Sequence, residues 1–180
     1  MTTPDTTPEA TPAATPPSGA AVHPRFAEAL RELGLDALTE RVRAFPDATR
    51  TAAQAAAAVG CDLAEIVKSL VFEADGVPVL VLVDGASRVD VERVRRELGA
   101  ASVKRADATL VRETTGYAIG GVPPFGHRTR TRVLADRGLL AHQVVWAAAG
   151  TPHTVFPMEP GTLIGHAGGT PVDVREGSGA

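Results

Sequence analysis

Apolar residues recur with helical spacing in several segments of this chain. The first segment follows His23-Pro24-Arg25 and ends at Gly34, with apolar side chains on one helical face at Phe26, Ala29, Leu30 and Leu33. Capping-box spacing at residues 51–54 predicts a helix over residues 52–59, which Gly60 ends. The same spacing at residues 62–65 and 87–90 predicts a short helix and a longer one that ends at Gly99. Further short helices are predicted at residues 107–113 and 159–164.

Other segments are rich in β-branched residues and indicate strands. Two such runs, residues 66–72 and 77–83, flank Asp75-Gly76 and predict a β-hairpin. Shorter strands are expected at residues 41–45, before a turn at Pro46-Asp47, and at residues 101–104, 131–134, 144–149, 154–156 and 171–174. Because helices alternate with hairpins and no repeat is present, we expect one α+β domain with a mixed sheet over residues 23–176.

Both ends of the chain differ from this pattern. Residues 1–22 are mainly Thr, Pro and Ala without periodicity, and we expect a disordered tail, as well as a flexible end at residues 177–180. The tail lacks the basic start and Leu-rich core of a secretory signal, and no apolar run could span a bilayer. The single cysteine, Cys61, excludes an internal disulfide and suits the cytoplasm.

The net charge of −3 argues against a general nucleic-acid binder, so any such contact requires a local basic patch. Two groups of basic residues could form one: Arg88, Arg93, Arg95, Arg96, Lys104 and Arg105, and then Arg128, Arg130, Arg132 and Arg137. A solvated helix face, balanced by Asp90, Glu92 and Glu97, explains the first group at least as well.

Candidate chemistry centres on Lys68 and two loops. Lys68 lies inside an apolar run, where an ammonium is costly to desolvate without a partner; it is either an exposed strand residue or a charge directed at a phosphate or carbonyl oxygen. The Gly- and Pro-rich segment 115–127 predicts an ordered turn whose N–H groups could hold an anion. Residues 150–153, Gly-Thr-Pro-His, interrupt two strand-like runs and combine tight backbone with an imidazole.

Other kinds of site are disfavoured. His127, His142, His153 and His166 lack the short spacing of zinc ligands, so we expect no metal and no cofactor. The serines lack a nucleophile-elbow context, and Cys61 after Gly60 reads as a small buried residue.

Four segments, in order, carry a family likeness: 58–60 (AVG), 65–72 (EIVKSLVF), 120–127 (GGVPPFGH) and 147–157 (AAAGTPHTVFP). Together they resemble the YbaK/ProX family of aminoacyl-tRNA deacylases, which includes the editing insertion of bacterial prolyl-tRNA synthetase. The likeness runs from about residue 24 to residue 175 and implies an α+β domain with a partly barrel-like sheet.

The resemblance also implies an activity. This activity is trans-editing, the hydrolysis of the ester on mischarged tRNA, which maintains translation fidelity. The substrate expected before others is Cys- or Ala-tRNA(Pro). The partners that the resemblance implies are the aminoacyl-tRNA 3′ end and prolyl-tRNA synthetase, with no membrane. Its implied catalytic residues are Lys68, Gly150 and His153, and its implied substrate-binding residues are Ser69, Gly120, Gly121, Pro124, Phe125, Thr151 and Pro152.

As a mechanism we expect Lys68 to anchor the terminal adenosine, backbone N–H groups near Gly150 to hold the ester carbonyl, and His153 to place water. Phe125 or Tyr117 would stack on the terminal base. This mechanism requires the Lys68 amine and the Gly150 backbone to share one hollow. The alternatives are a non-catalytic module that binds tRNA ends or nucleotides, a hydrolase of another small acyl ester, and a protein-interaction domain.

Overall fold

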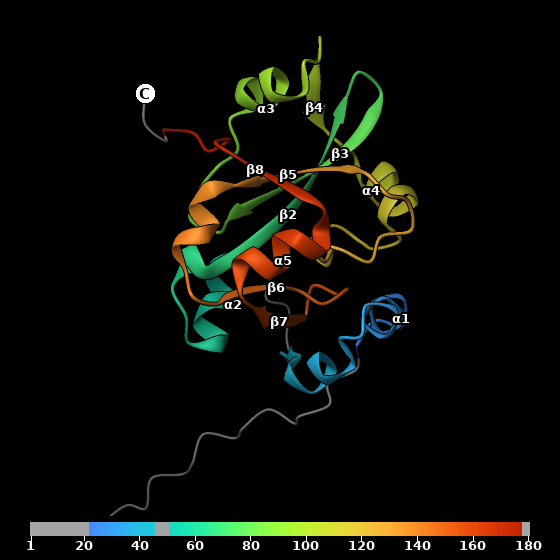
Figure 1. The fold of residues 1–180 in the computed structure, drawn as a ribbon, viewed down its shortest axis with the longest axis vertical. Helices are drawn as coiled ribbons and strands as arrows, with labels where there is room; N and C mark the ends of the chain where they lie inside the picture. The colour runs from blue at the N-terminus through green and yellow to red at the C-terminus, as the bar shows by residue number, and fades with distance from the viewer. Residues whose placement is uncertain (1–21, 46–50, 178–180) are drawn as a thin grey trace, which may run out of the picture.

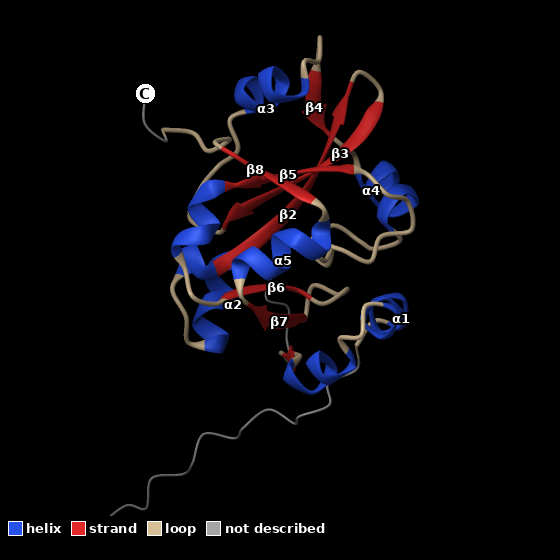
Figure 2. Cartoon of the chain, in the orientation of Figure 1, coloured by secondary structure: helices blue, strands red, loops and turns tan. Residues whose placement is uncertain are grey.

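A computed structural model describes residues 22–45 and 51–177 of the chain, which form a mixed β-sheet flanked by helices (Figures 1 and 2). The sheet runs in the order β1-β7-β6-β2-β3-β5-β8, and β4 pairs with β2 outside this path. The strands are β1 (Arg43–Ala44), β2 (Ile66–Ala74), β3 (Val77–Asp84), β4 (Val103–Arg105), β5 (Arg132–Asp136), β6 (Val145–Ala148), β7 (Thr154–Met158) and β8 (Gly169–Val172). The expected α+β class and mixed sheet are confirmed.

Helices begin and end at residues that satisfy their terminal backbone groups. The α-helices are α1 (Pro24–Glu32), α2 (Ala52–Val59), α3 (Val91–Leu98), α4 (Ala108–Thr115) and α5 (Pro160–Ala167), and the 3₁₀ helices are η1 (Asp36–Arg41), η2 (Leu63–Glu65) and η3 (Arg137–Ala141). Thr51 and Gln54 form the expected capping box of α2, and Gly60 ends it with a left-handed φ of 75°.

Two hydrophobic clusters cover the opposite faces of the sheet. The larger one packs Val67 and Val71 of β2 with the aromatic rings of Phe26, Tyr117, Phe125 and Phe156. The smaller one packs Phe72 of the same strand with Val94 of α3 and Leu134 of β5. Because successive side chains of a strand point to opposite faces, β2 contributes to both clusters and is the central strand of the fold.

The outer edge of β2 is covered at its two ends and open between them. β6 pairs with Ile66 and Val67, and β4 pairs with Phe72, Glu73 and Ala74. The Val71 carbonyl accepts a hydrogen bond from the Ala106 N–H, so the uncovered stretch is Lys68 to Leu70. A gap between two strands on one edge is a place where a ligand can reach the backbone of the third.

The structure corrects several predicted elements. Ser87 does not cap α3; the Asp90 carboxylate accepts from the Glu92 and Arg93 N–H groups, so the helix begins three residues later than a Ser87 cap would place it. The strand expected at residues 41–45 is only β1, because η1 occupies the residues before it. The last strand lies at β8, earlier than residues 171–174, and η3 was not expected. The turn at Pro46-Asp47 and nearly all of the tail lie outside the described residues, so the domain boundaries stay predictions.

Candidate functional site

A cavity of about 570 Å³ lies against the open edge of β2. A volume of this size is typical of small-molecule and cofactor sites. Its wall comes from several parts of the fold: β2, the α2 residues Ala52 and Ala55, the β6 residues Trp146 and Ala148, the loop around Gly120, the turn at residues 151–153, the first residues of β7, Val111 of α4, and Arg105 with Ala106. Ser69 and Leu70 lie on opposite faces of β2, and both line the cavity, so it reaches around the edge of the strand.

The cavity brings together six of the ten residues expected from the sequence: Lys68, Ser69, Gly120, Thr151, Pro152 and His153. The other four, Gly121, Pro124, Phe125 and Gly150, are not part of its wall. Residues from two loops and one strand, which span 85 positions of the chain from Lys68 to His153, therefore line one cavity.

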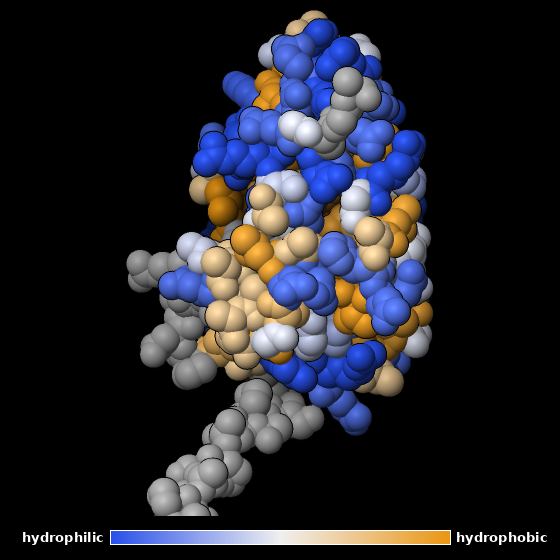
Figure 3. All heavy atoms as spheres, turned by 90° about the vertical axis from the view of Figure 1, so that its left-hand side faces the viewer, coloured by the Kyte–Doolittle hydropathy of each residue, from blue (hydrophilic) through white to orange (hydrophobic). Residues whose placement is uncertain are grey.

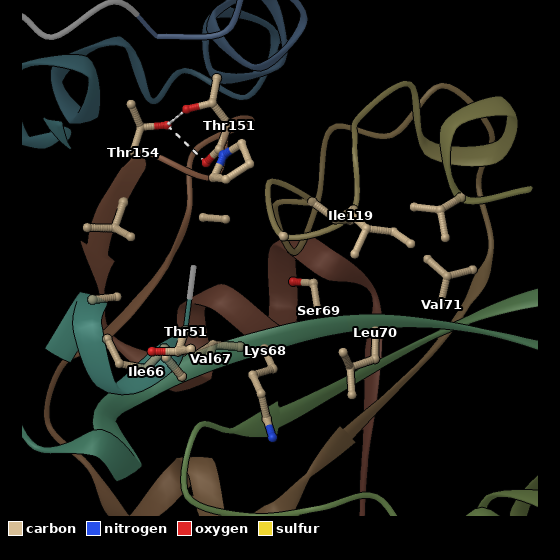
Figure 4. A pocket seen from close by; sticks show the side chains of 18 of the residues that line it. Thr51, Ile66, Val67, Lys68, Ser69, Leu70, Val71, Ile119, Thr151 and Thr154 are labelled. Carbon is tan, nitrogen blue, oxygen red and sulfur yellow. Dashed lines mark hydrogen bonds between the residues drawn. The ribbon is translucent and has the colours of Figure 1, made fainter. Parts of the chain in front are cut away.

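Lys68 differs in orientation from the expectation. Its amine donates a hydrogen bond to the Ser87 carbonyl, in the loop that follows β3. Figure 4 shows the side chain leaving β2 on the side away from Ser69, Ile119 and Thr151. Lys68 and the turn after Gly150 thus line the same cavity, but the amine points away from that turn. The hollow that the expected mechanism requires therefore contains Lys68 and residues 151–153, but not the Gly150 backbone.

One carboxylate and two arginines lie near the Lys68 amine. Burial lowers the pKa of the Lys68 amine, the nearby Asp84 carboxylate opposes that shift, and Arg105 and Arg88 add to it. Of these charged neighbours, Arg105 lines the cavity, and its guanidinium could bind an anionic group such as a phosphate.

Residues 151–154 form a tight turn at the cavity wall. The hydroxyls of Thr151 and Thr154 are 2.8 Å apart and hydrogen-bonded, and the Thr154 hydroxyl also donates to the Thr151 carbonyl at 3.5 Å (Figure 4). The Thr154 backbone N–H donates to the same carbonyl at 3.3 Å. His153 is exposed, and its N–H donates to the Thr151 hydroxyl. Among the described residues, no acceptor is recorded for the Thr151 N–H, which leaves this amide available to a ligand.

Gly150 and Gly121 let this turn and the Gly-rich loop approach each other. A side chain at Gly121 would lie 2.8 Å from the Thr151 backbone. Gly150 has a φ of 107°, and a side chain there would overlap His23, whose ring packs on Tyr117 at 4.8 Å. Both glycines therefore shape the cavity wall from behind it.

The expectation that Phe125 or Tyr117 stacks on a base is wrong. Phe125 is 5% exposed and packs on the rings of Phe26 and Phe156, and Tyr117 is 1% exposed and donates to the Gly126 carbonyl. Both are core residues because the loop folds back over the larger cluster. Pro124 and Phe125 line a second hollow of about 340 Å³ on the other side of this loop.

Sequence reasoning missed the α2 wall, Ile119, Trp146 and Arg105 as parts of the cavity. Trp146 is half-buried, and the guanidinium of Arg43 lies over its ring at 5.0 Å. A tryptophan at an alternating position of a strand, beside small alanines, was the available signal, since its ring cannot fit the core side of β6.

Part of the expected basic patch is an ion-paired helix surface. Arg93 pairs with Asp90 and Arg95 with Glu92 on α3. In Figure 3 the upper end of the molecule, where Figure 1 places α3 and β4, is predominantly hydrophilic. These arginines are therefore explained without a nucleic acid.

In the part of the chain that the structure describes, no three His, Cys, Asp or Glu side chains come together in a way that could hold a metal. None of the helices in residues 22–45 and 51–177 combines the length and apolar character needed to cross a membrane.

Comparison with known proteins gives a consistent result. Residues 46–165 match the model of the aminoacyl-tRNA editing domain. The chain is 32% identical over 123 residues to YwhH of Bacillus subtilis (strain 168), an uncharacterized protein, covering 68% of this chain and 78% of that protein. It is also 33% identical over 84 residues to the proline–tRNA ligase of Geobacter sp. (strain M21), although that match spans only 15% of the ligase.

Among solved structures, the chain is similar to a candidate trans-editing enzyme for prolyl-tRNA synthetase. The TM-score is 0.81 and the sequence identity 41%, over 87% of this chain and all of the other.

Proposed function

Because the chain belongs to the aminoacyl-tRNA editing domain family, we propose that it is a deacylase that hydrolyses the ester between an amino acid and the 3′ end of tRNA. The observation that carries this proposal is the cavity at the open edge of β2, where Lys68 and the turn at residues 151–153 meet. It combines a cationic end for a phosphate with an apolar interior and available backbone amides for an acyl group.

The chemistry needs little acid or base power, because an aminoacyl ester is already activated. Water attacks the ester carbonyl carbon, the carbonyl oxygen becomes an oxyanion, and the bond to the ribose oxygen then breaks. The proton from water passes to that ribose oxygen, which leaves free amino acid and uncharged tRNA. The catalytic contribution is to place the water and to stabilise the oxyanion.

Four residues would divide these tasks. The Thr151 N–H, the first amide after Gly150, would donate to the oxyanion, and Gly150 would hold the turn in shape. His153 would place the water. Lys68 would leave the Ser87 carbonyl and bind a phosphate of the terminal nucleotide, an exchange of a neutral acceptor for a charged one.

The proposed substrate is tRNA(Pro) carrying alanine or cysteine, in the cytoplasm, with prolyl-tRNA synthetase as a possible partner. The likeness to a proline–tRNA ligase and to a candidate trans-editing enzyme for prolyl-tRNA synthetase supports tRNA(Pro) as the tRNA. Small wall residues such as Ala52, Ala55 and Ala148 favour a compact amino acid.

The test is a deacylation panel with tRNA(Pro) charged separately with Ala, Cys, Ser and Pro. We expect release of a small non-cognate amino acid, retention of proline, and a rate lower by about 100-fold in Lys68→Ala, the loss typical of one electrostatic contact to a reacting group. Equal release by wild type and Lys68→Ala, with both folded, would reject the role of Lys68.

One observation favours a second candidate, a non-catalytic module that binds tRNA ends. The Lys68 amine is bonded to the Ser87 carbonyl and not directed into the cavity. Such a module would retain the charged tRNA end and protect its ester, so the panel would give saturable binding and no release above the spontaneous rate.

A further inference from the structure

On each side of the cavity, one arginine lies over an aromatic ring. The Arg43 guanidinium is 5.0 Å from the centre of the Trp146 ring, and the Arg105 guanidinium is 5.5 Å from the centre of the Phe72 ring. Trp146 and Arg105 themselves line the cavity. Each contact is thus a guanidinium over an aromatic ring, and one residue of each pair lines the same cavity.

Their positions in the sheet place them on opposite sides of the gap in β2. Arg43 is on β1, which pairs with β7 next to β6, and β6 covers the first end of the β2 edge. Arg105 ends β4, which covers the other end. A chain that enters the cavity along this edge passes both guanidinium groups.

Neither guanidinium is neutralised within the described residues. Arg93, Arg95, Arg137 and Arg175 each have a carboxylate partner, whereas no ion pair is recorded for Arg43 or Arg105, and both are exposed. A ring beneath a guanidinium restricts the motion of that side chain. In that state, little side-chain entropy is lost when it binds a phosphate with two hydrogen bonds.

We propose that Arg43 and Arg105 are two phosphate-binding positions for the single-stranded 3′ end of an RNA, one on each side of the cavity. The inference rests on the proposed function for the kind of ligand, but the binding it describes does not need hydrolysis. Arg105 also adds to the positive charge near Lys68, so the terminal phosphate meets the larger cationic cluster at the β4 end.

The test uses a labelled, uncharged RNA hairpin with a single-stranded ACCA 3′ end, and measures its Kd from low to moderate salt. Each phosphate contact on a single strand contributes about 0.7 to the slope of log Kd against log salt. We expect Arg43→Gln and Arg105→Gln each to reduce that slope by about 0.7. Arg137→Gln, the matched control, removes an arginine that is paired with Asp173 and does not line the cavity, and should leave the slope unchanged.

Two further variants separate charge from packing. Arg43→Lys and Arg105→Lys keep the charge and lose the flat stacking, so they should keep most of the slope while raising Kd. Unchanged slopes in both Gln variants, or no measurable binding of the hairpin by the wild type, would overturn the inference.

The two proposals fail separately. Reduced slopes in the Gln variants support the inference even when no charged tRNA is hydrolysed. The absence of hydrolysis would reject only the deacylase proposal. Active deacylation with unchanged slopes would reject only the proposal that Arg43 and Arg105 bind phosphates.

Discussion

Gly150 is the residue whose backbone most constrains the candidate site. Its φ of 107° is a conformation that only glycine adopts readily, and the space beside its Cα is filled by His23 and Tyr117. The tight turn at residues 151–154 therefore depends on a residue without a side chain, and His23 fixes the position of that turn relative to α1.

Gly150→Ala should lower the free energy of unfolding by about 1–3 kcal/mol from backbone strain alone, with the overlap on His23 adding to this loss. The matched control is Gly165→Ala in α5, where nothing lies within 4 Å of the added methyl group and the helix gains up to about 1 kcal/mol. Urea unfolding measures both. Equal stability of Gly150→Ala and wild type would contradict this account of the turn.

The Gly-rich loop at residues 120–127 is an element held by few but specific hydrogen bonds. The Tyr117 hydroxyl donates to the Gly126 carbonyl at 2.8 Å, and the His127 Nε2 lies 2.6 Å from the Pro123 carbonyl, which requires a proton on that nitrogen. Burial lowers the pKa of His127, and the bond to Pro123 opposes part of that shift.

This shift predicts a pH dependence of stability. Because the pKa of His127 in the folded state lies below its unfolded value near 6.5, the unfolded chain binds more protons between these two values. The free energy of unfolding should therefore fall as pH is lowered from about 6.5 through the folded pKa, and His127→Gln should weaken this dependence.

Melting temperatures at pH 7 and pH 5 measure the effect. His23 has a pKa lowered by burial as well, so a smaller dependence should remain in His127→Gln. An identical pH dependence in the variant and the wild type would show that His127 is not the group responsible.

At the scale of elements, the sequence predicts features that depend on neighbouring residues, but not those that depend on segments far apart in the chain. The Thr51–Gln54 box, the Asp75-Gly76 turn and the order of helices and strands were predicted correctly, because each depends on residues within about four positions. The gap in β2 was not predictable, since it depends on where β6 and β4 end along a strand far away in sequence.

The same limit applies to the candidate site. Lys68 and residues 151–153 could be selected from their sequence context, and the cavity joins them. The burial of Phe125 and the orientation of the Lys68 amine toward the Ser87 carbonyl could not be predicted, because both follow from packing against segments outside their own motifs.

On the scale of the whole molecule, a buried ion cluster attaches the last residues to the sheet. Arg175 Nε lies 2.8 Å from Asp136 Oδ1, and its Nη1 lies 3.5 Å from Asp84 Oδ2. Asp136 is 0% exposed and also accepts the N–H groups of Gly138 and Val174. The ends of β3 and β5 are thereby joined to the segment after β8.

Arg175→Leu should lower the free energy of unfolding by about 3–5 kcal/mol, because it leaves two buried carboxylates without their cation. Arg137→Leu removes an exposed ion pair with Asp173 and should cost no more than about 1 kcal/mol. Denaturant unfolding of the two variants compares them directly; similar losses would show that burial does not distinguish the two pairs.

The central claim is that the ester is hydrolysed inside the cavity at the open edge of β2, and a variant that fills the cavity tests it most directly. Ala148→Phe places a ring in the cavity, while Ala58→Phe places the same ring on the exposed face of α2. The measurement is the single-turnover rate of amino-acid release from mischarged tRNA(Pro). We expect a loss of about 100-fold in Ala148→Phe, as displacement of a bound substrate by an ångström can cause, and no change in Ala58→Phe. A folded Ala148→Phe protein that releases the amino acid at the wild-type rate would contradict the account.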